Sequence, residues 1–203
     1  LADVYDAAND ACYRVAARQV IAAAPQFVLQ RLMGPRPGAA AFTYTPWLVA
    51  NLTLKHAPEG LAWDNVAYDS PSLGYVAATH QHLAASPGPA VLTYYYPLTD
   101  APPEAARAAA YRRTCAEWQA LVLEDMERIH PGITGWTEAL DVWLWGHGMA
   151  RPTPGFLWGG ARQAAAAPVG RIRFAHSELG GLPLFEEAFY QGLKAAEAVL
   201  ALV

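Results

Sequence analysis

The spacing of apolar residues predicts one long amphipathic helix in the middle of the chain. Asp100 followed by two prolines is typical of a helix start, and Pro131-Gly132 is a helix stop, so we expect a helix over 102–130. On its polar face, Glu124 and Arg128 have the i,i+4 spacing of a weak ion pair. Its apolar stripe consists of Tyr111, Cys115, Trp118, Val122, Met126 and Ile129.

Extended segments dominate the region before this helix. They are rich in β-branched and aromatic residues, and clusters of Gly, Pro, Asp and Ser separate them. Their hairpin-like spacing predicts an antiparallel or mixed sheet. The expected strands are 47–54, 65–68, 73–82 and 90–96, followed by 136–146 beyond the helix.

The two ends of the chain carry further short elements. Residues 12–24 predict a short strand, a turn and a buried strand that Pro25 ends, and 26–33 predicts one or two helical turns. Near the C-terminus, 171–175 predicts a strand and 185–200 an amphipathic helix. The expected fold is therefore α+β, with a mixed, largely antiparallel sheet packed against a long helix and a C-terminal helix.

The C-terminal helix has an unusual start. The stretch FAHSELGGLPLFEEAFYQG runs from a strand through a Gly/Pro loop into the helix without Ser, Thr, Asn or Asp at the N-cap. The first N–H groups of this helix therefore lack a side-chain acceptor from the chain itself.

Composition excludes several classes of protein. The 203 residues are 54% hydrophobic and 16% charged, which suffices for a globular core. The net charge of −4 without a basic stripe argues against a nucleic-acid partner, and no apolar run reaches the roughly 20 residues that span a membrane. Cys12 and Cys115 are far apart, and the acidic N-terminus does not resemble a signal peptide. We expect a cytoplasmic location.

The segment from 171 to 200 resembles the C-terminal flavin motif of the FAD-dependent amine oxidase and phytoene desaturase superfamily. In that family the motif reads roughly F-A-G-[DE], a loop, and G-A-x-x-S-G-x-x-A-A. Phe174 to Glu178 match its first part, and the small residues Ala188, Gly192, Ala195 and Ala196 match its second. The segment RQVIAAAP, residues 18–25, is similar to the strand that leads from the FAD domain into the substrate domain of this family.

The resemblance implies a division of the chain and a missing part. Residues 1–33 would connect from the FAD domain, 34–168 would form the substrate domain, and 169–203 would supply the flavin-facing strand and helix. No G-x-G-x-x-G follows a strand, so the N-terminal Rossmann portion that holds the FAD pyrophosphate is absent. The chain thus resembles the C-terminal half of a flavoenzyme, and we do not expect it to retain FAD or activity by itself.

The resemblance also implies which residues face the cofactor. Backbone N–H groups at the start of the C-terminal helix would face the pyrimidine edge of the isoalloxazine ring and stabilise its negative charge on reduction. The expected cofactor-binding residues are Pro25, Ser177, Glu178, Leu184, Phe185, Glu186 and Ala188.

Candidate substrate-pocket residues lie on the predicted strands. Aligning VANLTL with the family's substrate-domain strand puts Asn51 where many amine oxidases have a lysine that holds a water at the flavin, so the chain departs from the amine oxidase pattern at this position. Trp143, Trp145 and His147 share one face of an extended strand, although aromatic residues on strands more often belong to the core. Tyr95 is a further candidate. His80 and His82 share a face too, but no third ligand accompanies them, so no metal site is predicted.

Two functions are consistent with these patterns. The first is the substrate-binding and flavin-facing portion of an oxidoreductase in which hydride passes from a small-molecule substrate to flavin. The alternative is a noncatalytic ligand-binding or interaction domain with the same fold and no flavin. In either case, flavin-facing surfaces left exposed would favour a homodimer.

Overall fold

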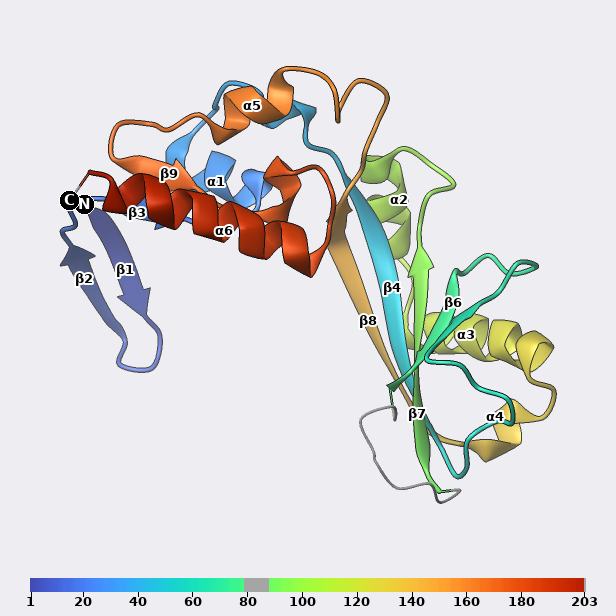
Figure 1. Cartoon of the computed structure of the whole chain (residues 1–203). Helices are drawn as coiled ribbons and strands as arrows, with labels where there is room; N and C mark the ends of the chain where they lie inside the picture. Colours follow the sequence, from blue (N-terminus) through green and yellow to red (C-terminus); the bar gives the residue numbers. More distant parts are fainter. Residues whose placement is uncertain (79–87, 203) are drawn as a thin grey trace. The chain divides into compact units, whose positions relative to one another are not determined.

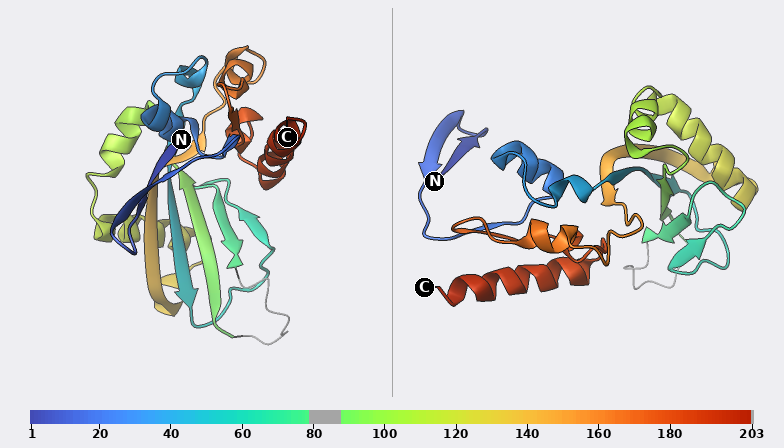
Figure 2. Two further views of the ribbon diagram at one scale, coloured as in Figure 1. Left: turned by 90° about the vertical axis from the view of Figure 1, so that its left-hand side faces the viewer. Right: turned by 90° about the horizontal axis from the view of Figure 1, so that it is seen from above.

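The computed structural model describes residues 1–78 and 88–202 and divides the chain into two compact units (Figures 1 and 2). We call residues 44–149 the central unit, and residues 1–43 together with 150–203 the terminal unit. His80 and His82 lie outside the described residues. Within the described ranges, no helix is long and apolar enough to cross a membrane.

The central unit is built on a five-stranded sheet in the order β5-β6-β7-β4-β8. The pairs β5–β6, β6–β7 and β4–β7 are antiparallel, which confirms the predicted α+β fold with a largely antiparallel sheet. The strands are β4 (Tyr44–Leu54), β5 (Asp64–Val66), β6 (Gly74–Ala77), β7 (Ala90–Pro97) and β8 (Thr137–Ala150).

Three helices pack on one face of this sheet, which we call the helix face. They are α2 (Pro103–Ala110), α3 (Cys115–Ile129) and α4 (Ile133–Trp136). Burial alternates along β4 and β7, because even-numbered side chains point to the helices and odd-numbered ones point to the opposite face, which we call the second face. The core includes Leu48, Leu52, Leu92 and Tyr94 from the sheet and Trp118, Val122, Met126 and Ile133 from the helices.

The long helix expected over 102–130 is in fact two helices, so that prediction was wrong. Thr114 is the N-cap of α3 and forms a capping box: its hydroxyl accepts from Glu117 N–H at 3.3 Å, and Glu117 Oε2 accepts from Thr114 N–H at 2.7 Å. Because the chain turns between α2 and α3, Tyr111 is exposed rather than part of the apolar stripe. The predicted Glu124–Arg128 pair is also replaced, since Arg128 pairs with Asp125.

Replacing Thr114 by alanine is expected to lower the free energy of unfolding by about 1 kcal/mol, because the first turn of α3 loses its hydroxyl acceptor. Urea unfolding followed by tryptophan fluorescence measures the change. Glu124→Ala, at an exposed position in the second half of α3, is the matched control and should change little. Equal effects of the two substitutions would contradict a role for the cap.

The terminal unit contains a hairpin, a parallel strand pair and helices. Strands β1 and β2 form the antiparallel hairpin, and β3 and β9 pair in parallel. The elements are β1 (Ala2–Asp6), β2 (Ala11–Val15), β3 (Val20–Ala22), α1 (Gln26–Met33), η1 (Ala39–Ala41), α5 (Ala161–Ala166), β9 (Ile172–Phe174), η3 (Ser177–Leu179) and α6 (Phe185–Leu200). The C-terminal helix has the predicted bounds.

Two features of this unit differ from the sequence prediction. Strand β1 was not predicted, because its alternation of polar and apolar residues is short and both faces of the hairpin are largely exposed. Strand β3 was predicted to be buried, but Ile21 is 42% exposed, because β3 pairs with β9 alone.

Candidate functional site

The two segments that carry the flavin-motif resemblance lie side by side in the terminal unit. Parallel pairing sets Val20 opposite Ile172 and Ala22 opposite Phe174, and Ala175 N–H donates to Ala22 O at 3.1 Å. Their carboxyl ends therefore meet at the same edge, which is where ligands bind in parallel sheets. The fold thus brings together residues separated by about 150 positions in the chain.

Pro25 and Glu178 meet at this edge. Helix α1 has Pro25 as its N-cap without a side-chain cap of its own, and the carboxylate of Glu178 accepts the N–H of Gln26 at 2.9 Å. Glu178 is only 5% exposed, so its charge lies buried at the positive end of α1. Ser177, its neighbour, begins the short helix η3. Within this chain, Glu178 thus acts as a capping residue contributed from elsewhere in the sequence.

Two interacting polar side chains near this edge, the buried Gln26 and the half-buried Arg36, were not predicted. The Nη1 of Arg36 donates to Gln26 Oε1 at 2.9 Å, and its guanidinium carbon lies 3.5 Å from the centre of the Phe174 ring. Burial lowers the pKa of Arg36. Gln26 is a polar residue at the first position of α1, and hydrophobic periodicity does not predict burial for such a residue. The contact between Gln26 and Arg36 therefore could not be predicted from the sequence.

The start of α6 is open, as the sequence predicted. Leu184 is the N-cap and no side chain accepts from the first turn, while Ala188 N–H makes a backbone bond to Leu184 O at 3.1 Å. Leu184 and Phe185 are both largely exposed. Glu186 and Glu187 follow in the first turn, where acidic residues suit the positive helix end. The N–H groups that precede Ala188 are therefore available to an external acceptor.

The second face of the central sheet carries the other candidates. Asn51 of β4 lies directly opposite Thr93 of β7, whose hydroxyl donates to Asn51 Oδ1 at 2.8 Å. Tyr95, two residues further along β7, donates its hydroxyl to Asp64 Oδ1 of β5 at 2.5 Å. Burial, reinforced by the Asp64 carboxylate, raises the pKa of Tyr95 to about 12. Sequence periodicity assigned Asn51 and Tyr95 to strands but did not identify Thr93 and Asp64, because partners across strands depend on register.

The aromatic residues of β8 separate into two environments. Leu144 and its even-numbered neighbours pack against the core, so Trp143 and Trp145 point to the second face, where they are 45% and 58% exposed. The Nε2 of His147 lies 3.1 Å from Arg107 Nη1 of α2, and its ring is 5.5 Å from that of Tyr44. His147 is thus tied to α2, whereas the two tryptophans supply exposed aromatic surface.

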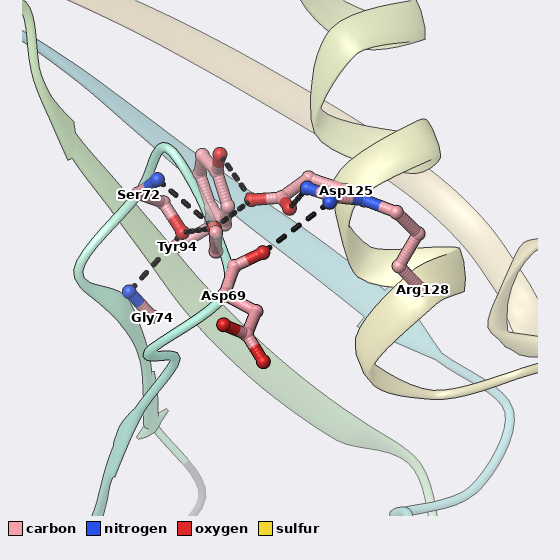
Figure 3. A network of polar contacts seen from close by, with 7 residues as sticks. Asp69, Ser72, Gly74, Tyr94, Asp125 and Arg128 are labelled. Atoms are coloured by element: carbon pink, nitrogen blue, oxygen red, sulfur yellow. Dashed lines mark hydrogen bonds and ion pairs between the residues drawn. The ribbon is translucent and has the colours of Figure 1, made fainter.

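A buried carboxylate organises the helix face of the same sheet (Figure 3). Asp125 of α3 is 3% exposed and accepts hydrogen bonds from Tyr94 Oη at 2.8 Å and from Ser70 Oγ at 2.5 Å, and it also pairs with Arg128. Arg128 in turn donates to Asp69 O at 3.3 Å. Burial raises the pKa of Tyr94, so this hydroxyl keeps its proton and remains a donor. These contacts connect the segment before β6 to α3 and β7 and are structural.

Comparisons with known proteins show the same fold in several oxidases. No protein-family model and no curated protein matches the chain. Among solved structures, a putrescine oxidase variant matches with a TM-score of 0.68 at 17% identity. The match covers 91% of this chain and 43% of the putrescine oxidase chain. Cyclohexylamine oxidase from Brevibacterium oxydans IH-35A has a TM-score of 0.66 at 16% identity, covering 90% and 42%. A putative protoporphyrinogen oxidase from Exiguobacterium sp. 255-15 has a TM-score of 0.57 at 14% identity, covering 90% and 41%.

These likenesses confirm the predicted resemblance at the level of the fold. Nine tenths of the chain superimposes on each of these oxidases, but the chain spans less than half of their length. The α+β fold of this chain is therefore that of one portion of the amine oxidase-type enzymes.

Proposed function

We propose that the chain forms the substrate-binding and flavin-facing portion of an FAD-dependent oxidoreductase of the amine oxidase type. The observation that carries the proposal is the joint placement of the two motif segments: β3 and β9 pair, α1 and η3 follow them, and α6 begins with an open first turn. The shared fold with oxidases of different substrates supports the same assignment.

The residues at the start of α6 fit a flavin. A flavin bound there would accept electrons from the substrate as hydride. The N–H groups of Phe185 and Glu186 are free of intrahelical acceptors and lie at the positive helix end, which suits the charge that a reduced flavin carries. Pro25, Ser177, Leu184 and Ala188 are proposed to line the same site. Glu178 is proposed to act there indirectly, by fixing α1, because its carboxylate already accepts from Gln26.

The second face is proposed to bind the substrate. Trp143 and Trp145 offer apolar surface, and Asn51 and Tyr95 offer polar groups held by Thr93 and Asp64. A small number of oriented polar groups in an aromatic surrounding is typical of small-molecule sites. We also propose a cytoplasmic location, and association of this chain through exposed apolar residues of α6 such as Phe185, Phe189 and Leu193.

The intact gene product that contains this chain tests the proposal. Purified intact, it is expected to show the visible absorption bands of a flavin and to release FAD on denaturation. Glu186→Pro removes an N–H of the first turn that makes no intrahelical hydrogen bond, and should weaken flavin binding about fivefold. Glu186→Ala keeps the N–H and is the matched control.

A colourless intact product would contradict the flavin assignment and favour the noncatalytic ligand-binding alternative. Equal flavin affinity in Glu186→Pro and Glu186→Ala would show that the start of α6 does not contact the cofactor.

A further inference from the structure

Asn51 occupies a central place on the second face of the sheet. Strand β4 lies between β7 and β8, so Asn51 is flanked by strands on both sides. In register, the row that crosses the sheet at this level reads Asn51, Thr93, Val76 and Asp64. The neighbouring odd-numbered residues of β4 on this face are Val49 and Thr53, so the amide of Asn51 lies between an apolar and a hydroxyl side chain.

The amide of Asn51 is held in one orientation. Thr93 Oγ1 donates to its Oδ1 at 2.8 Å, which turns Nδ2 and its two hydrogens the other way. Within residues 1–78 and 88–202, no acceptor for Nδ2 is present, and the buried polar atoms without partners belong to Gln19, Gln26 and Arg36 instead. The Nδ2 group of this half-buried side chain is therefore a donor without a hydrogen-bond acceptor within the described chain.

The nearby polar groups of this face make no hydrogen bond to this donor within the described residues. Asp141 of the flanking strand β8 lies on the second face by the same alternation as Trp143, and its carboxylate disfavours an anionic acceptor on a ligand. Tyr95 directs its hydroxyl to Asp64, at the opposite edge of the sheet, and keeps its proton at neutral pH. Asn51 itself carries no charge and cannot neutralise a charged group. On this surface, a neutral acceptor is the group that best complements the free amide donor, because an unmatched donor costs about 1–3 kcal/mol when a ligand covers it.

We propose that Asn51 determines specificity on the second face, where its Nδ2 donates a hydrogen bond to a carbonyl oxygen or ring nitrogen of a neutral, largely apolar ligand. Thr93 is the positioning residue that fixes the amide. The inference rests on the proposed function in one respect, namely that the second face binds the substrate. It adds the chemical class: a ligand with an uncharged acceptor on an apolar body, for which Trp143 and Trp145 provide aromatic contact area.

Two probes that differ in one carbonyl group test the proposal. Acetophenone and ethylbenzene are titrated into the isotope-labelled 203-residue chain, and the side-chain NH₂ resonances of Asn51 are followed by NMR. Acetophenone is expected to shift these resonances to saturation. Asn51→Asp keeps the size and the Thr93 contact but replaces the amide donor by a carboxylate oxygen, which repels a carbonyl oxygen. It should therefore weaken acetophenone binding about fivefold or more and ethylbenzene binding less than about twofold.

Two further variants keep the test informative if Asn51→Asp folds poorly. Thr93→Val leaves the amide in place but frees it to rotate, and should weaken acetophenone binding by a smaller factor than Asn51→Asp. Thr53→Val, on the same face of β4, is the matched control and should leave both probes unchanged.

Several results would overturn the proposal. These are equal loss of both probes in Asn51→Asp, saturation by acetophenone without movement of the Asn51 resonances, or no binding of either probe at millimolar concentration. The flavin test is independent of this one. If the intact product lacks flavin but Asn51→Asp has the expected effect on acetophenone binding, the oxidoreductase proposal is rejected and the ligand class is retained. If the intact product contains flavin but Asn51→Asp lacks that effect, the oxidoreductase proposal is retained and the ligand class is rejected.

Discussion

Replacing Asp125 by alanine is expected to lower the free energy of unfolding of the central unit by about 3 kcal/mol. The carboxylate is 3% exposed and accepts from Tyr94 and Ser70 while pairing with Arg128. Its removal takes the carboxylate acceptor away from the Tyr94 hydroxyl, which is fully buried between the sheet and α3.

Tryptophan fluorescence during urea unfolding is a suitable measurement, because six of the seven tryptophans lie in the central unit. Asp125→Asn keeps one oxygen acceptor and should cost less than Asp125→Ala. Glu124→Ala removes an exposed carboxylate from the adjacent position of α3 and serves as the control. If Asp125→Ala destabilises no more than Glu124→Ala, the network in Figure 3 does not stabilise the central unit.

The sequence contained a signal for this carboxylate that the apolar stripe concealed. Trp118, Val122 and Met126 define the buried side of α3, and Asp125 lies three residues after Val122 and seven after Trp118, on that same side. A charged residue at an inward position predicts a buried partner. Its identity could not be predicted, because Tyr94 and Ser70 come from a strand and a loop whose distance from α3 depends on the whole sheet.

The break between α2 and α3 could also have been predicted. Thr114 and Glu117 have the spacing of a capping box, yet the apolar residues on either side continue at helical spacing and suggested one helix. The capping box determines where α3 begins, because it satisfies the N–H groups of Thr114 and Glu117. The spacing of apolar residues carries no information about these hydrogen bonds.

The candidate site divides in the same way between local and non-local information. Alternation along β4 and β7 correctly placed Asn51 and Tyr95 on strands, since side-chain direction follows from period two. Their partners Thr93 and Asp64 depend on register, which loop lengths and packing set. The open start of α6 was predictable because it depends only on which residues precede the helix.

Replacing Glu178 by alanine is expected to destabilise the start of α1 by about 2 kcal/mol, because the N–H of Gln26 loses its buried acceptor and no other side chain caps this helix. Few tryptophans report on the terminal unit, so amide hydrogen exchange is the measurement. Exchange of the α1 amides should become about thirtyfold faster where they open by local unfolding. Glu178→Gln retains an oxygen acceptor and should have a smaller effect.

The control for this prediction is Glu186→Ala, which removes an exposed carboxylate from α6 and should leave α1 exchange unchanged. Unchanged α1 exchange in Glu178→Ala as well would mean that the carboxylate does not support α1. If Glu178→Ala both accelerates exchange of the α1 amides and weakens flavin binding in the intact product, the carboxylate acts on the flavin site through α1. The carboxylate would then influence the flavin site by holding the end of β3 against the end of β9.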